Sequence, residues 1–287
     1  MTIEAFLEQI TAWAGEQSDV RAVFLVGSQA RRVVPADELS DVDLVLVVDD
    51  PAPYVESAGW LEAFGRPLLT FYEPTPLGGL VERRVLFDSG LEVDFNLAPA
   101  AGMTALLADP EAMAVVARGY RILHDELGLD TDFANAASVE SNALTAAQLA
   151  QLSHDFWYHA LWAAKKLRRG ETYVAKQACD GYLKCLLVQL LTINARTSGV
   201  DTWHQGRFLE RWAAPADLVE VGASYAHYDS ADIARAIKAT AAMFERLERE
   251  LADHLGVGPV VDHSEVVRRL DVLLGPCPIS ESGSTPA

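Results

Sequence analysis

The chain has 287 residues, of which 50% are hydrophobic and only 22% charged, a balance that excludes an intrinsically disordered protein. Asp and Glu number 41 against 23 Lys and Arg, so the formal net charge is −18. Such a charge repels phosphate backbones, which disfavours a nucleic-acid partner, and attracts cationic small molecules.

The first hundred residues show one helical pattern followed by strand patterns. Apolar residues at helical spacing over residues 2–15 predict an amphipathic helix. Strands are predicted at 22–26, 42–48 and 67–72, and a helix at 54–64 between them. Two further strands, at 83–87 and 91–97, flank the turn-forming triplet Asp88-Ser89-Gly90 and are expected to pair as a β-hairpin.

After Pro99 the pattern becomes helical. Residues 100–125 are expected to be helical, and from Ala146 onward apolar residues form three successive helical stripes. We therefore predict the α+β class, with an N-terminal domain at 1–135 and a helical domain at 146–256. Residues 257–287 form a C-terminal extension whose Pro-, Ser- and Gly-rich end is expected to be mobile.

Other features predict a cytoplasmic protein that does not contact a membrane. No stretch approaches the ~20 apolar residues of a membrane span, and the acidic N-terminus does not resemble a secretory signal. Three cysteines are too few for a disulfide scaffold and indicate a reducing compartment. In the helical half, Trp157, Tyr158 and Trp162 are expected to be core residues rather than a stacking platform for a ligand.

The clearest chemical signal lies where two strands end and begin. One strand ends in Gly27-Ser28, and the next opens with Asp41-Val42-Asp43. Strand residues i and i+2 point to the same face, so both carboxylates aim at one point and require a cation between them. Mg²⁺ takes oxygen ligands and is typically shared with substrate phosphates. Gly27 permits close backbone approach, and Ser28 offers a hydroxyl and an N–H to a phosphate.

A third acidic position follows in the strand at 91–97, where Glu92, Asp94 and Asn96 share a face. Beside the first acidic strand, Asp94 would complete a carboxylate triad that binds metal or deprotonates a hydroxyl group. An isolated Asp-x-Asp is commonly a solvated strand end, and an isolated Gly-Ser is commonly a turn. Their combination with a later strand Asp favours a functional site.

These motifs resemble the polymerase-β-like nucleotidyltransferase superfamily. Trp60-Leu61 followed by Phe64-Gly65, and residues 87–99, are similar to segments of the aminoglycoside 6-adenylyltransferases, the streptomycin-modifying enzymes. The resemblance continues in the helical half and spans about residues 20 to 255; the segments concerned are Phe156-Trp157, Ala164-Lys165, Leu167-Arg168, Ala175-Lys176 and Asp180. The family pattern has an arginine directly after Gly-Ser, whereas this chain has Gln29 at that position. Arg31 is the candidate to take the place of that arginine.

The resemblance implies a nucleotidyltransferase domain, with a mixed sheet flanked by helices, and a helical bundle that closes the active-site cleft. It implies Mg²⁺-dependent transfer of AMP from ATP to a hydroxyl of an aminoglycoside, with streptomycin as the first candidate, and release of pyrophosphate. Asp41, Asp43 and Asp94 would bind the metal, and Asp94 would also act as general base. The implied nucleotide-binding residues are Gly27, Ser28, Arg31, Lys165 and Lys176, and the implied substrate-binding residues are Glu92, Glu171 and Asp180.

Two alternatives remain open at this stage. The same transfer could act on another small molecule or on a protein hydroxyl. The chain could instead be a non-catalytic nucleotide-binding module, although the presence of all three aspartates argues against loss of catalysis. A terminal transferase acting on nucleic acid is disfavoured by the acidic balance. The oligomeric state cannot be inferred from the sequence.

Overall fold

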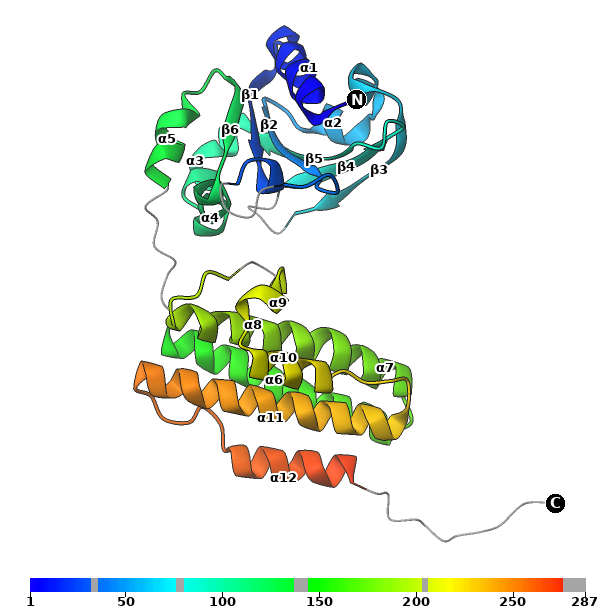
Figure 1. Cartoon of the computed structure of the whole chain (residues 1–287), viewed down its shortest axis with the longest axis vertical. Coiled ribbons are helices and arrows are strands. Elements are labelled where there is room, and N and C mark those ends of the chain that lie inside the picture. Colours follow the sequence, from blue (N-terminus) through cyan, green and yellow to red (C-terminus); the bar gives the residue numbers. More distant parts are fainter. Residues whose placement is uncertain (32–35, 76–79, 137–143, 203–205, 276–287) are drawn as a thin grey trace, which may run out of the picture. The chain divides into compact units, whose positions relative to one another are not determined.

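The computed structural model describes residues 1–31, 36–75, 80–136, 144–202 and 206–275. The chain forms two compact units, Met1–Asn142 and Ala143–Ala287, which we describe separately (Figure 1). The end of the C-terminal extension, residues 276–287, lies outside the described residues, so its expected mobility stays a prediction.

The first unit is built on a six-stranded mixed sheet with the strand order β3-β4-β5-β2-β1-β6. Its strands are β1 (Val20–Val26), β2 (Val42–Val48), β3 (Pro67–Pro74), β4 (Val81–Phe87), β5 (Glu92–Pro99) and β6 (Arg121–Asp125). Neighbours are antiparallel except β2 and β5, which run parallel. The expected β-hairpin is confirmed, because β4 pairs antiparallel with β5 across the turn at Asp88-Ser89-Gly90.

Helices cover both faces of this sheet, because its central strands are apolar on both sides. Val42 and Leu44 of β2 pack in one core with α1 (Ile3–Glu16), α2 (Ala52–Glu56) and the 3₁₀ helix η2 (Gly59–Phe64). Val45 and Val47 pack in a second core with α3 (Met103–Leu107), α4 (Pro110–Arg118) and α5 (Leu129–Ala136). Two more 3₁₀ turns, η1 (Gly27–Gln29) and η3 (Ala100–Gly102), follow β1 and β5. The predicted α+β class is confirmed.

Two local predictions are wrong. The single helix expected at 54–64 is interrupted after α2, because Ser57 is extended and its hydroxyl accepts from the Gly59 N–H (3.1 Å). The helix expected to continue through 100–125 ends at Gly119, which has φ +145°. A Cβ at Gly119 would lie 2.2 Å from the Ala30 carbonyl oxygen. The chain then extends as β6, which pairs with β1.

The second unit is helical, and the predicted helical stripes are confirmed. It consists of α6 (Ala146–Arg168), α7 (Thr172–Gln177), the π-helical turn η4 (Ala178–Tyr182), α8 (Leu183–Thr197), α9 (Leu209–Trp212), α10 (Pro215–Ala223), α11 (Ser230–Leu255) and α12 (His263–Leu274). Its core includes Phe156 stacked on Phe244, with ring centroids 3.6 Å apart. The buried carboxylate of Glu248 accepts from Ser153 (2.7 Å) and Trp157 (3.0 Å), and lies 3.0 Å from Nε2 of His263.

Membrane-spanning helices were sought only among the described residues. There, no single helix combines the length and apolar character needed to cross a bilayer. The segments Ala100–Leu107 and Pro110–Arg118 meet the length and composition requirement only when taken together, and they are bent by 87° at the break between them.

Candidate active site

Three aspartates meet at one place on the sheet. Asp41 directly precedes β2, Asp43 lies within β2, and Asp94 lies in the parallel strand β5. The register places Asp43 opposite Asp94, and strand alternation gives Asp41 the same face as Asp43. One carboxylate oxygen from each of the three lies within 4.8 Å of the others. The structure therefore brings together the three residues expected to bind metal.

The helices on this face of the sheet pack mainly beyond the aspartates. On the face that carries the aspartates, α3, α4 and α5 pack against Val45, Val47 and Ala98, which lie in the later halves of β2 and β5. The aspartates lie near the beginnings of the same strands. Asp94 is 7% exposed, whereas Asp41 and Asp43 are half-buried, so the trio extends from the protein interior to the surface.

The turn after β1 fits closely against the trio. Gly27 has φ +66°, and a Cβ at this position would lie 1.8 Å from Oδ2 of Asp43. Only glycine permits both this backbone conformation and this close approach. Ser28 is buried, and its hydroxyl donates to the Asp41 carbonyl (3.1 Å). The predicted Gly27-Ser28 pair thus lies beside the aspartates, and the serine hydroxyl holds the Asp41 backbone.

Strand β4 adds two charged residues that sequence analysis missed. In the β4–β5 register, Arg84 lies opposite Asp94 and Glu82 lies opposite Asn96. Nη1 of Arg84 is 3.8 Å from Oδ2 of Asp94, and Nε of Arg84 is 2.9 Å from Oε1 of Glu73. The expected hairpin contained a signal for Arg84, since pairing across the short turn places it beside the acidic strand, whereas Glu82 lies outside the strand expected at 83–87.

The electrostatics of this cluster favour a cation. Burial, the neighbouring charge and hydrogen bond of Glu82, and the charge of Asp43 raise the pKa of Asp94 to about 8, against the opposing effect of Arg84. Negative charge is therefore crowded at Asp94. The donors are hard carboxylate oxygens, the ligand type that Mg²⁺ prefers. The residues present fit a divalent cation.

Two other residues of this unit, Glu92 and Arg31, were expected to bind the acceptor and the nucleotide, and they lie close in sequence to Asp94 and Ser28. Glu92 is exposed at the start of β5 and, two residues before Asp94, shares its face. Arg31 is half-buried shortly after η1. Hydrogen bonds from Ser40 and the Leu39 N–H, with a smaller effect of the Arg31 charge, lower the pKa of Asp37.

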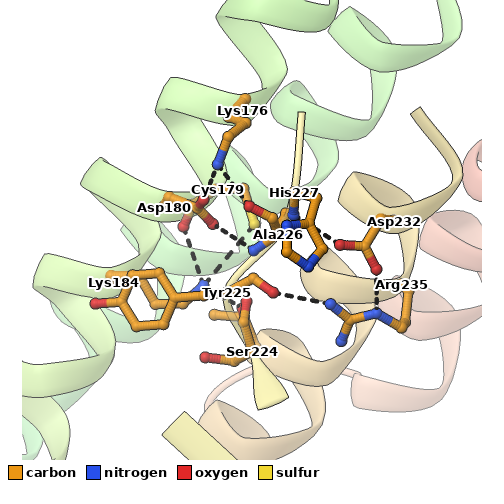
Figure 2. A network of polar contacts seen from close by, with 11 residues as sticks. Lys176, Cys179, Asp180, Lys184, Ser224, Tyr225, Ala226, His227, Asp232 and Arg235 are labelled. Carbon is orange, nitrogen blue, oxygen red and sulfur yellow. Dashed lines mark hydrogen bonds and ion pairs between the residues drawn. The ribbon is translucent and has the colours of Figure 1, made fainter. Parts of the chain in front are cut away.

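The predicted residues of the helical unit are partly paired with one another. Lys165 is exposed on α6. Lys176 forms an ion pair with Asp180 and donates to the Ala226 carbonyl (2.7 Å), as Figure 2 shows. Glu171 forms ion pairs with Lys166 (2.8 Å) and with a neighbouring arginine. Glu171 and Asp180, expected to bind substrate, therefore each have a lysine partner.

A buried lysine in the same unit was also missed. Lys184 donates to the hydroxyl of Thr240 (2.6 Å) and to the carbonyl of Cys179 (3.2 Å). Its ammonium group lies 5.1 Å from the centroid of the Tyr225 ring, and burial lowers its pKa. Cys179 lies in η4 and Lys184 follows it closely, and Figure 2 shows both, with Tyr225, beside the Lys176–Asp180 pair. No periodic signal distinguishes this lysine from solvated ones in the sequence.

One prediction about the aromatic residues is partly wrong. Trp157 is buried and Trp162 packs partly against the core, but Tyr158 is 67% exposed. The buried side of α6 already includes both Phe156 and Trp157, and Tyr158 lies about 100° further round the helix, beyond that side.

Comparison with known proteins identifies similar chains. Residues 1–269 match the family model described as streptomycin adenylyltransferase. The aminoglycoside 6-adenylyltransferase of Bacillus subtilis (strain 168) is 21% identical over 252 residues, covering 82% of this chain and 85% of that protein.

Solved structures give weaker similarities. The crystal structure of an aminoglycoside 6-adenyltransferase from Bacillus subtilis is 16% identical, with a TM-score of 0.45 over 95% of this chain and 98% of that one. A nucleotidyltransferase-like protein from Exiguobacterium sibiricum 255-15 is 13% identical, with a TM-score of 0.43 over 88% and 78% of the two chains.

Proposed function

Because the chain belongs to the streptomycin adenylyltransferase family, whose model matches residues 1–269, we propose that it transfers AMP from ATP to a hydroxyl group of an aminoglycoside. Family membership makes the chain a nucleotidyltransferase. Streptomycin is the first acceptor to test, because the family description names it. The observation that carries the proposal is the convergence of the Asp41, Asp43 and Asp94 carboxylates at one place on the sheet. We propose a cytoplasmic reaction, since ATP, the proposed donor, is available there.

The three aspartates are the proposed ligands of Mg²⁺. A divalent cation held there would neutralise charge on the triphosphate and on the departing pyrophosphate. The Asp43 carboxylate occupies the space that a Cβ at Gly27 would need, so glycine lets the turn pack directly against a proposed metal ligand. Ser28 fixes that turn through its bond to the Asp41 carbonyl.

Asp94 is the proposed general base. It is the most buried of the three carboxylates, and it borders β4 on the side away from Asp43. In the proposed step, the acceptor hydroxyl gives its proton to a carboxylate oxygen of Asp94, and the hydroxyl oxygen attacks the α-phosphorus. The bond from this phosphorus to the bridging oxygen breaks, and pyrophosphate leaves with the electron pair.

The remaining predicted residues are kept as proposed ligands. Arg31, Lys165 and Lys176 are candidates for phosphate oxygens. Glu92, Glu171 and Asp180 are candidates for the positively charged groups of the acceptor. Since Lys176 and Asp180 are paired with each other, a substrate group at this pair meets an ion pair rather than an isolated charge.

Pyrophosphate release from ATP and Mg²⁺, measured with and without streptomycin, tests the proposal together with the mass of the antibiotic. We expect release only with streptomycin, and a product heavier by one AMP group. Asp94→Asn is expected to lower turnover by about 10²-fold or more while Mg-ATP still binds. Asp88→Asn, in the exposed turn before the same strand, is the matched control and should retain turnover.

The possible results separate the alternatives. Pyrophosphate release with a different small molecule or with a protein would mean that streptomycin is not the acceptor, while the proposed AMP transfer stands. Binding of Mg-ATP without release for any acceptor would favour a non-catalytic nucleotide-binding module. Full turnover of Asp94→Asn would remove Asp94 from the role of base.

A further inference from the structure

Exposed aromatic side chains surround one carboxylate on the helical unit. Asp155, Tyr158 and His159 lie on the same side of α6, and Tyr182 approaches them from η4. The ring of His159 lies 4.5 Å from that of Tyr182 and 5.2 Å from that of Tyr158, measured between centroids. We call these four residues the aromatic–carboxylate cluster.

The Asp155 carboxylate is held in place by neutral or titratable groups. The Tyr182 hydroxyl donates to it at 2.9 Å, and Nδ1 of His159 lies 2.7 Å from its Oδ1. The hydrogen bond to Asp155 raises the pKa of Tyr182. Within the described part of the chain, no lysine or arginine forms an ion pair with Asp155. In contrast to Glu171 and Asp180, this carboxylate has no lysine neutralising its charge.

Core packing does not explain the cluster. The buried side of α6 is formed by Phe156, Trp157 and Ala160. Tyr158 and Tyr182 keep 67% and 44% of their surface exposed, so they contribute little apolar burial. Fixing partly exposed rings around a carboxylate costs side-chain entropy without much burial in return. A positively charged ligand that covers the rings would bury their apolar surface and neutralise the charge of Asp155.

We propose that the aromatic–carboxylate cluster is the subsite that binds a positively charged group of the acceptor. The identity of the acceptor as an aminoglycoside rests on the proposed function. Asp155 accepts charge-assisted hydrogen bonds from an ammonium or guanidinium group. The faces of Tyr158 and His159 pack against that group and the ring that carries it, as aromatic rings do with cations. Tyr182 orients the carboxylate through its hydroxyl.

Titration of the full chain with streptomycin, without nucleotide, measures this subsite directly. Asp155→Asn keeps the shape and removes the charge, and we expect the Kd to rise about tenfold or more. Tyr158→Ala is expected to raise the Kd about threefold or more through loss of the ring. Asp253→Asn and Tyr173→Ala, at exposed positions on α11 and α7, are the matched controls and should leave the Kd unchanged.

The outcomes distinguish the subsite from the proposed reaction. Streptomycin binding that weakens in Asp155→Asn supports the subsite, even if the chain releases no pyrophosphate. Pyrophosphate release with streptomycin, together with a Kd unaffected by both Asp155→Asn and Tyr158→Ala, overturns the subsite and leaves the reaction standing. A wild-type chain that binds none of streptomycin, kanamycin and spectinomycin also overturns it. Because Tyr158 is mostly exposed, Tyr158→Ala tests the subsite even if Asp155→Asn folds poorly.

Discussion

Replacing Gly27 with Ala tests the close approach between the turn after β1 and the trio of aspartates proposed to bind metal. The new Cβ would lie 1.8 Å from Oδ2 of Asp43, so that carboxylate or the turn has to move. The positive φ of +66° costs an alanine roughly 1–2 kcal/mol. Overpacking adds about 1–3 kcal/mol. The free energy of unfolding is therefore expected to fall by about 2–5 kcal/mol in total.

Gly90→Ala separates the two contributions. Gly90 has φ +82° in the β4–β5 turn, and a Cβ there would meet no atom within 4 Å. Urea unfolding should therefore show only the backbone cost for Gly90→Ala and the larger loss for Gly27→Ala. A Mn²⁺ titration followed by electron paramagnetic resonance should show weaker binding, by about tenfold, for Gly27→Ala alone, because one carboxylate ligand is displaced. Equal loss of stability in both variants, with Mn²⁺ affinity unchanged, would refute this reasoning.

Three further predictions concern charged groups. Arg84→Met removes a guanidinium 3.8 Å from Asp94 and should tighten Mn²⁺ binding about threefold to tenfold, whereas unchanged or weaker binding would contradict a direct electrostatic effect. Glu248→Ala leaves its buried donors, including His263, without an acceptor, so urea unfolding should show a loss of about 3–5 kcal/mol; a loss below ~1 kcal/mol would contradict this. Burial lowers the pKa of Lys184 from 10.5, so between the lowered value and 10.5 the unfolded state binds more protons and this group's contribution to stability rises with pH. The stability of wild type relative to Lys184→Met should therefore increase as the pH rises toward 10.5, and a constant difference would contradict the shift.

The acidic trio was predictable because its signal is local. Alternation places Asp41 and Asp43 on one face of β2 and gives Asp94 the polar face of β5, and this does not depend on the rest of the fold. The parallel register that sets Asp43 opposite Asp94 was not predictable, because β3 and β4 lie between these strands in the chain. The family resemblance indicated that Asp94 joins Asp41 and Asp43, which strand alternation alone did not determine.

The errors and omissions depend on tertiary contacts. Strand β6 has only two apolar residues in succession, Ile122 and Leu123, and its extended form depends on pairing with β1. Arg84 could have been found by extending the hairpin register, since β4 and the turn were recognised. The buried Lys184 could not, because its burial depends on packing against α11, which begins more than forty residues later. The ion pair of Lys176 with Asp180 was readable from helical spacing alone.

The parallel pairing of β2 with β5 sets when the trio of aspartates can assemble. The β4–β5 hairpin connects neighbouring stretches of chain, whereas the contact of Asp43 with Asp94 closes a long loop. Long loops cost more entropy to close, and here mutual repulsion of the carboxylates opposes the closure. A newly synthesised chain therefore cannot bring the three carboxylates together until β5 has left the ribosome and joined β2. If the trio binds a divalent cation as proposed, the ion offsets this repulsion and stabilises the β2–β5 pairing as well as serving the proposed reaction.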